Sequence, residues 1–230
     1  GRSREVSEVL VLGGSMKLIS ELNIIVTGVG GQGQLFLSRL IAETFLRLGT
    51  PSLIAETHGM SQRGGSVIVH VRVGNTVKAP LIPRGEADIM LGLELIEAAR
   101  YVDYLRVNGV AIVNEKLIVP AGQSLKLKKE EVLGFLSEKP IKLILVRSSQ
   151  RAASLGVPLS ANVHMFGALV ALLEAVGVLT PDIDSIVASI LPKRMLDQNL
   201  LLYREGKGDV KTQLGSEEVE KIKKVLLEKL

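Results

Sequence analysis

The sequence predicts an α/β protein whose sheet is mostly parallel. Buried strands alternate with amphipathic helices along the first two thirds of the chain, a glycine-rich turn joins the first strand to the first helix, and the last third is mainly helical. Hydrophobic residues make up 47% of the 230 residues, which is enough for one sizeable core. We therefore expect helices on both faces of the sheet and a helical C-terminal portion.

The first β-α-β unit is the clearest part of this pattern. Residues 23–27 are apolar enough for a buried strand, residues 34–48 carry apolar side chains at helical spacing, and residues 52–55 form a second short strand. Strands joined through a helix run parallel with a right-handed crossover. We expect that geometry here.

An antiparallel hairpin is expected to interrupt the alternation. Valine occupies every second position from Val67 to Val73, the next two residues are a glycine-asparagine turn signal, and residues 76–82 have the pattern of a returning strand. His70 points away from the valines, so we expect it at the surface or in an interface.

The alternation then resumes, which completes a Rossmann-like sheet with one inserted antiparallel hairpin. Further strands are predicted at 87–91, 110–113 and 142–146, and further helices at 94–105, 130–137, 162–177, 182–191, 193–205 and 216–230. We expect residues 21–230 to form a single α/β domain. Residues 1–20 are expected to be an N-terminal appendage, because Gly13-Gly14-Ser15 precedes Met16, a residue suited to a native start.

Composition narrows the function classes. The net charge of +4 is spread along the chain, aromatic residues are 3% and tryptophan is absent, which argues against nucleic-acid binding. Cysteine is absent, which excludes disulfides, thiol nucleophiles and thiolate-held iron–sulfur clusters on this chain. Three widely separated histidines show no metal-site spacing, and no apolar run reaches the length of a membrane span. We expect a cytoplasmic protein with no metal site and no membrane partner.

The glycine turn is the first candidate binding element. Gly28, Gly30 and Gly33 match the spacing G-x-G-x-x-G between a strand and a helix, where a backbone without Cβ atoms approaches a pyrophosphate at the helix N-terminus. Gly31 and Gln32 make the turn unlike an ordinary nicotinamide fingerprint. The glycines also suit a purely architectural turn, and that alternative stays open.

A nicotinamide site is a further alternative for this turn. Glu56 lies near the spacing of a ribose-binding acid. No regular helix can follow the second strand, however, because a glycine-rich loop takes its place, so NAD binding is disfavoured.

The second candidate element is the polar loop 57–66. It offers Ser61, Gln62, Arg63, Gly64 and Ser66, whose side chains or backbone suit phosphate or carboxylate groups. The alternative is a subunit-contact loop in which the arginine pairs with a partner's carboxylate. His58 beside the loop more often makes a structural hydrogen bond than transfers a proton, so we assign no catalytic residue.

Three groups of residues resemble the gamma-type subunits of 2-oxoacid:ferredoxin oxidoreductases, specifically the beta subunits of indolepyruvate:ferredoxin oxidoreductase. They are Gly28-Val29-Gly30-Gly31-Gln32-Gly33, then Glu56-Thr57-His58-Gly59-Met60-Ser61-Gln62-Arg63-Gly64-Gly65-Ser66-Val67, and the series Ala87-Asp88, Glu94, Arg100, Asn114, Asn162 and Gly167-Ala168-Leu169. The similarity spans about residues 23–206. One departure is Val157-Pro158-Leu159-Ser160, which stands where a Gly-Asn-like turn is expected before Asn162.

The resemblance implies a heteromeric enzyme that oxidatively decarboxylates a 2-oxoacid, here an aryl pyruvate, to an acyl-CoA and passes electrons to ferredoxin. It implies that a larger partner holds thiamine diphosphate and the iron–sulfur clusters, and that this chain is the non-thiamine subunit, inactive alone, with a role in handling coenzyme A. The alternatives are a stand-alone CoA- or nucleotide-binding protein and a purely structural assembly subunit. Lys126, Lys128 and Lys129 are most simply a solvated face, with docking of an acidic ferredoxin as the alternative.

Overall fold

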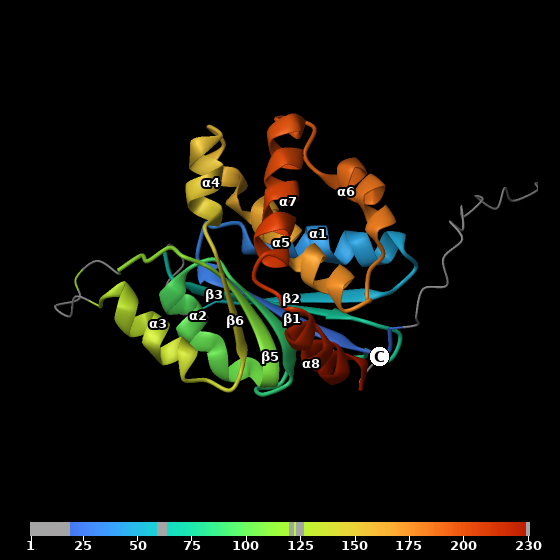
Figure 1. Cartoon of the computed structure of the whole chain (residues 1–230), viewed down its shortest axis with the longest axis horizontal. Coiled ribbons are helices and arrows are strands. Elements are labelled where there is room, and N and C mark those ends of the chain that lie inside the picture. Colours follow the sequence, from blue (N-terminus) through green and yellow to red (C-terminus); the bar gives the residue numbers. More distant parts are fainter. Residues whose placement is uncertain (1–18, 59–63, 120–121, 123–126, 229–230) are drawn as a thin grey trace, which may run out of the picture.

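The computed structural model describes residues 19–58, 64–119, 122 and 127–228 (Figure 1). Its centre is a six-stranded sheet with helices on both faces. The strands are β1 (Leu22–Val29), β2 (Ser52–His58), β3 (Ser66–Val73), β4 (Ala87–Gly92), β5 (Leu105–Asn114) and β6 (Lys142–Val146). The helices are α1 (Gln34–Arg47), α2 (Leu95–Tyr101), α3 (Lys129–Ser137), α4 (Ser148–Ser154), α5 (Ala161–Ala175), α6 (Asp184–Ile190), α7 (Leu196–Lys211) and α8 (Ser216–Leu227).

The strand order is β2-β3-β1-β4-β5-β6. The pairs β1–β4, β4–β5 and β5–β6 are parallel, whereas β3 is antiparallel to both β1 and β2. The prediction of a mostly parallel sheet with an antiparallel insertion is therefore confirmed. The first two strands do run in the same direction, but β3 separates them.

The predicted position of the hairpin is wrong. Thr76–Ile82 forms no strand, and the antiparallel hairpin consists of β2 and β3, whose connection includes the polar loop. The reason lies in the pairing of β3. This strand is bonded along its whole length to β1 on one side and to β2 on the other, so it offers no free edge to a third strand.

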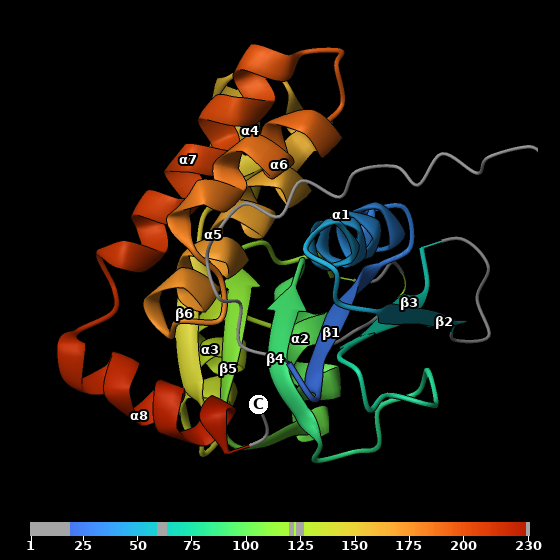
Figure 2. The same ribbon diagram turned by 90° about the vertical axis from the view of Figure 1, so that its right-hand side faces the viewer.

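Apolar side chains of the sheet alternate between two cores, one under each of the two layers of helices that cover the sheet in Figure 2. In β1, Ile24 and Val26 join the core beneath α1, α5, α6 and α7, whereas Ile25 joins the core beneath α2 and α3. All three side chains are fully buried. Coverage of both faces explains why these three consecutive residues of β1 are all apolar instead of alternating with polar ones.

The same coverage corrects the prediction for His70. Its side chain is only 2% exposed, because the segment after β3 and the 3-10 turn Val102–Tyr104 cover that face. Its Nδ1 accepts the backbone N–H of Ile82 at 3.2 Å, and its ring lies edge-on to Tyr104. Burial, followed by the charge of nearby Arg72, holds the pKa of His70 below its ordinary value.

Two glycines let α5 and α7 cross at very short range. A Cβ on Gly167 would lie 2.0 Å from the carbonyl oxygen of Tyr203, and one on Gly206 would lie 2.0 Å from that of His164. The segment Pro158–Ala175, which includes α5, is apolar and long enough to cross a bilayer, contrary to our expectation, but 67% of it is buried inside the fold. It is the central helix of the core.

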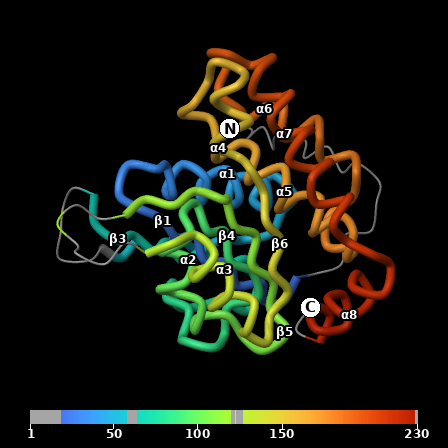
Figure 3. Tube along the Cα trace, turned by 60° about the vertical axis from the view of Figure 1, so that its left-hand side comes forward, coloured from blue at the N-terminus to red at the C-terminus, as the bar shows by residue number. Residues whose placement is uncertain are grey.

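The C-terminal helix returns to the sheet. Figure 3 shows α8 beside β5, where the guanidinium of Arg106 donates to the carbonyl of Val225 at 2.6 Å and Lys142 pairs with Glu218. At the other end, residues 1–18 of the predicted appendage lie outside the described residues, whereas Ile19 is buried in the core.

Candidate functional site

The two glycine-rich motifs meet at one point of the sheet edge. The backbone N–H of Gly30 donates to the carbonyl of Gly65 at 2.8 Å, just beyond the pairing of Val29 with Ser66. This point lies at the carboxyl end of β1, where open α/β sheets bind ligands. The fold therefore brings the predicted turn and the described part of the predicted loop together.

The turn leads directly into the N-terminus of α1. Gly31 and Gly33 have φ values of 95° and 85°, a region that favours glycine. Gly33 is the N-cap residue, no side chain caps the helix, and its first turn contains no acidic residue. The partial positive charge of the N-terminus is thus left without a carboxylate from the helix's own first turn.

Two glutamines hold the turn in place. The amide oxygen of Gln32 accepts the N–H of Val29, and the amide nitrogen of Gln34 donates to the carbonyl of Val29, both at 2.8 Å. A Cβ on Gly28 would lie 2.6 and 2.7 Å from these amides. Gly28 is therefore required by the architecture of the turn itself.

Gly30 is different from the other glycines of the fingerprint. Its φ is not in the left-handed region, and an added Cβ would meet nothing closer than the Gly65 carbonyl at 3.5 Å. Neither backbone strain nor a clash within the described residues explains a glycine here. The open backbone at Gly30 leaves space for a close approach by another molecule.

The polar loop is only partly described. Ser61, Gln62 and Arg63 lie outside the described residues, and their predicted role stays a prediction. Gly64 is exposed with φ of 71°. Ser66 is at the start of β3, where its hydroxyl bonds to the Glu97 carboxylate and lies 2.7 Å from the Tyr101 hydroxyl.

Ser66 therefore anchors the end of the loop to α2. Glu97 is 5% exposed and also pairs with Arg100 at 3.3 Å. The sequence did not indicate this cluster, because the serine and the acid are far apart in the chain and neither belongs to a local motif.

Asn162 lies beside the turn, where a Cβ on Gly33 would be 2.5 Å from its amide nitrogen. It is the second residue of α5, which begins at Ala161, and Ser160 occupies the N-cap position. The side chain is 5% exposed, and its amide oxygen has no hydrogen-bond partner among the described residues.

Other residues of the resemblance series serve the framework. Glu94 caps α2 by accepting the N–H of Glu97 at 2.8 Å, and it also accepts that of Ile118 at 2.9 Å. Asn114, at the end of β5, donates to the carbonyl of Leu93 and exchanges hydrogen bonds with Ser149. These contacts hold the carboxyl ends of β4 and β5 and the start of α4 in register.

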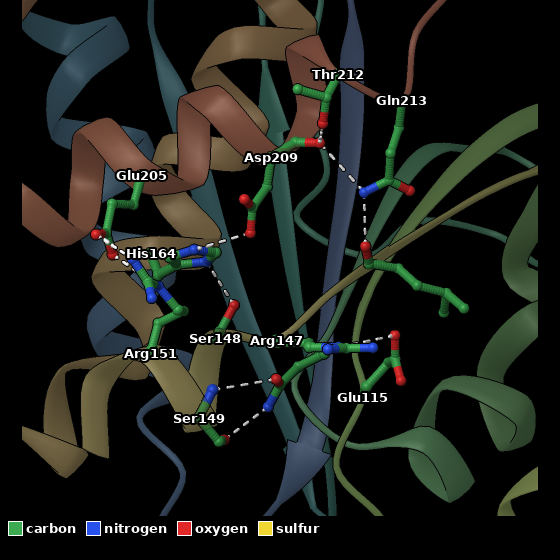
Figure 4. A network of polar contacts seen from close by, with 12 residues as sticks. Glu115, Arg147, Ser148, Ser149, Arg151, His164, Glu205, Asp209, Thr212 and Gln213 are labelled. Atoms are coloured by element: carbon green, nitrogen blue, oxygen red, sulfur yellow. Dashed lines mark hydrogen bonds and ion pairs between the residues drawn. The ribbon is translucent and has the colours of Figure 1, made fainter. Parts of the chain in front are cut away.

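A buried polar network supports this edge from behind (Figure 4). Ser148 Oγ lies 2.8 Å from Nδ1 of His164, whose Nε2 lies 3.2 Å from an oxygen of Asp209. Ser148 and His164 are fully buried, so this Ser-His-Asp arrangement joins α4, α5 and α7 instead of facing a substrate.

A small polar hollow of about 270 Å³ lies at the carboxyl ends of β5 and β6. Glu115 pairs there with Lys129 and lies 3.8 Å from Arg147. Lys128 is exposed, as expected of a solvated face, and Lys126 lies outside the described residues.

Comparison with known proteins decides the family. The pyruvate ferredoxin/flavodoxin oxidoreductase family matches residues 23–208, which include the glycine turn, the polar loop and the α5–α7 pair. The chain belongs to this family. The expectation drawn from the sequence motifs is therefore confirmed.

Relatives place the chain among the small subunits of the pyruvate ferredoxin/flavodoxin oxidoreductase family. It is 46% identical over 152 residues to the indolepyruvate oxidoreductase subunit IorB of Archaeoglobus fulgidus, which covers 64% of this chain and 75% of that protein. It is 33% identical over 202 residues to IorB of Thermococcus kodakarensis, with coverage of 86% and 100%. The chain is a small subunit of the 2-oxoacid:ferredoxin oxidoreductase type.

Solved structures share the fold. The gamma subunit of a keto/oxoacid ferredoxin oxidoreductase from Geobacter sulfurreducens superposes with a TM-score of 0.62 at 20% identity, covering 83% of this chain and 99% of that one. The 2-oxoglutarate:ferredoxin oxidoreductase of Magnetococcus marinus gives 0.61 at 20% identity and covers 86% of this chain, but this is only 32% of its own longer chain.

Proposed function

We propose that this chain is the non-thiamine subunit of an indolepyruvate-type 2-oxoacid:ferredoxin oxidoreductase. In this role it supports the oxidative decarboxylation of an aryl pyruvate to an acyl-CoA. The observation that carries the proposal is the junction of Gly30 with Gly65, because it leaves an open, Cβ-free backbone at an uncapped helix N-terminus. The similarity to IorB subunits supplies the reaction class.

Coenzyme A is the anionic molecule that we assign to this junction. Its phosphates suit the N–H groups and partial charge at the start of α1, and the backbone of Gly30 and Gly31 leaves room for them. Ser61, Gln62 and Arg63 of the loop would add side-chain donors. The Magnetococcus enzyme with this fold was solved with coenzyme A and succinyl-CoA bound.

The division of labour is the one that the family resemblance implies. We assign thiamine diphosphate, the iron–sulfur clusters and the transfer of electrons to ferredoxin to the larger subunit, and the absence of cysteine agrees with this for the clusters, since this chain has no thiolate to hold one. Alone, the chain would be inactive. We place the complex in the cytoplasm and assign no nucleic-acid or membrane partner to it.

The test is reconstitution with the larger subunit from the same organism. Each purified subunit and the mixture are assayed for aryl pyruvate- and CoA-dependent reduction of ferredoxin or a viologen dye. We expect turnover only in the mixture. Reduction by this chain alone at the same rate would contradict the proposal, and so would a larger subunit whose full activity needs no second chain.

A further inference from the structure

A groove of about 550 Å³ lies next to the glycine turn, between the start of α1, the entry to α5 and the start of α7. We call it the Leu159 groove. Its lining is mostly apolar and includes Phe36, Val157, Pro158, Leu159, Val163 and Met195. It contains the Val157-Pro158-Leu159-Ser160 segment that departs from the resemblance pattern.

Two buried amides line this groove without partners for their oxygens. Asn162 is 5% exposed and Asn199 is 2% exposed, and the Oδ1 atom of each lacks a hydrogen bond within the described residues. A buried acceptor without a donor costs free energy, so each of these oxygens calls for a donor from outside the described residues, either a water molecule or a group of a bound partner.

The rim of the groove is apolar and protrudes. Leu159, on the 3-10 turn Pro158–Ser160, is 92% exposed, the largest exposed fraction among the large hydrophobic side chains of the described residues. Met195 is 43% exposed and has φ of 60°, an unusual backbone conformation for a residue other than glycine. A molecule contained within the Leu159 groove would leave the Leu159 side chain in water, whereas a protein surface laid over the rim of the groove would cover it.

Arg194 adds a charge to this surface. It is exposed in the loop before α7, and its guanidinium makes no ion pair with any side chain in the described ranges. A partner that covers the apolar rim would therefore gain from a carboxylate at this position.

We infer that the Leu159 groove is the docking surface for the larger catalytic subunit. It takes an extended segment of that subunit, with an apolar side chain against Leu159 and Met195, N–H or O–H donors for the two amides, and an acidic residue at Arg194. The inference rests on the proposed function. Asn162 connects this surface to the glycine turn through its contact with Gly33, so docking also fixes the position of the turn.

The larger subunit is a better occupant than a second copy of this chain. The relatives are named as subunits, and in the Magnetococcus enzyme this fold accounts for only 32% of a longer chain. In that enzyme the fold is thus directly attached to further protein of the same enzyme. The groove also lies next to the candidate CoA site, because its lining residue Asn162 is beside Gly33, and a catalytic partner must reach that site.

The first experiment compares two leucines. Leu159→Asp is co-expressed with the larger subunit, and its affinity for that subunit is measured by titration of the purified chains. We expect affinity to fall about 30-fold or more, the effect of losing one interface hot spot. The melting temperature of the isolated chain should stay unchanged. Leu81→Asp is the matched control, because Leu81 is 52% exposed and precedes Ile82, which belongs to the core on the other face of the sheet.

The second experiment uses the absence of cysteine. Leu159→Cys and Leu81→Cys variants each carry one thiol, which is labelled with a benzophenone maleimide and irradiated in the assembled complex. We expect a cross-link to the larger subunit from position 159 only.

The outcomes of these experiments distinguish a failure of the docking inference from a failure of the proposed function on which it rests. If the wild-type chain assembles and Leu159→Asp assembles equally well, or if position 159 cross-links to a second copy of this chain, the docking inference is overturned and the proposed function stands. If the wild-type chain binds no larger subunit, both are overturned.

Discussion

The carbonyl of Gly65 accepts the N–H of Gly30 at 2.8 Å, and this bond joins two motifs that are far apart in the sequence. The turn thereby becomes dependent on the loop, since any displacement of Gly65 removes a hydrogen bond from Gly30. The turn and the described end of the loop are therefore joined in one candidate surface.

Gly30→Ala should show whether the glycine leaves space for a ligand or is required by the architecture of the turn. The added Cβ makes only ordinary contacts, at 3.5 Å or more, so the melting temperature should stay near that of wild type. In the assembled enzyme the apparent CoA requirement should rise about tenfold or more, because a methyl group would stand where an anion approaches the backbone. Steady-state kinetics with varied CoA measures this. An unchanged CoA requirement would show that Gly30 faces no ligand.

Gly28→Ala is the informative contrast to that variant. Its Cβ would displace the Gln32 and Gln34 amides from Val29. We expect a loss of about 1–2 kcal/mol in the free energy of unfolding, from two weakened hydrogen bonds. Denaturant unfolding measures this loss. If Gly28→Ala were as stable as wild type, the bracing role of the glutamines would be wrong.

Arg63→Ala tests the two interpretations of the polar loop. Loss of a charged hydrogen-bonding partner typically costs about 1.5–3 kcal/mol, or roughly 10- to 150-fold. Assembly and turnover are measured separately on the complex. A raised CoA or substrate requirement with normal assembly assigns the arginine to the site, and weaker assembly with normal turnover assigns it to the interface. If both stay normal, the loop is only a connector.

Sequence patterns predicted those parts of the fold that depend on residues close together in the chain. The strand–glycine–helix signal fixed β1, the turn and α1 within a residue or two, because each depends on neighbours in the sequence. The place of β3 depends on which distant strands pair with it, and the Gly74-Asn75 signal therefore pointed to the wrong hairpin. His70 was assigned to the surface or to an interface because valine occupies only one side of its strand, although both faces of the sheet are covered.

The candidate site shows the same limit. The glycines were recognised, yet their different roles depend on tertiary contacts, with Gly28 against two glutamine amides, Gly33 beside Asn162, and Gly30 open. The contacts of Ser66 and His164 join residues on separate elements at no regular spacing, so no sequence signal could have found them.

Two buried histidines should make stability depend on pH. Burial holds the pKa of His164 below its ordinary value of about 6.5, although the carboxylates of Asp209 and Glu205 oppose the shift and Arg151 adds to it. His70 is shifted in the same direction. Below pH 6.5 the unfolded chain takes up protons that the folded chain does not, so the free energy of unfolding should fall as pH falls, until the lowered folded values are passed.

The measurement is denaturant unfolding at a series of pH values below 6.5. Each histidine contributes up to about 1.36 kcal/mol per pH unit to the slope of the free energy of unfolding against pH, which corresponds to one proton taken up on unfolding. His164→Gln and His70→Gln should therefore each reduce this slope by up to that amount. Equal slopes in wild type and both variants would show that these histidines are not held neutral in the fold.

The last prediction concerns the crossing of α5 and α7. Gly206→Ala places a Cβ 2.0 Å from the carbonyl oxygen of His164, a backbone atom in the middle of the core. The helices must move apart, and we expect a loss of at least about 2 kcal/mol, or roughly 4–8 °C in melting temperature. Gly167→Ala should act alike, since its Cβ would meet the Tyr203 carbonyl at the same distance.

The matched control for this crossing lies two residues further along the same helix. Gly208 is exposed, and an added Cβ would meet nothing within 4 Å. Gly208→Ala should therefore stabilise the chain by about 0.5–1 kcal/mol, because alanine loses less backbone entropy than glycine in a helix. Thermal unfolding of the three variants decides between a close crossing and a general intolerance of α7 to substitution. Equal destabilisation by Gly206→Ala and Gly208→Ala would contradict the close crossing, whereas opposite signs would establish it.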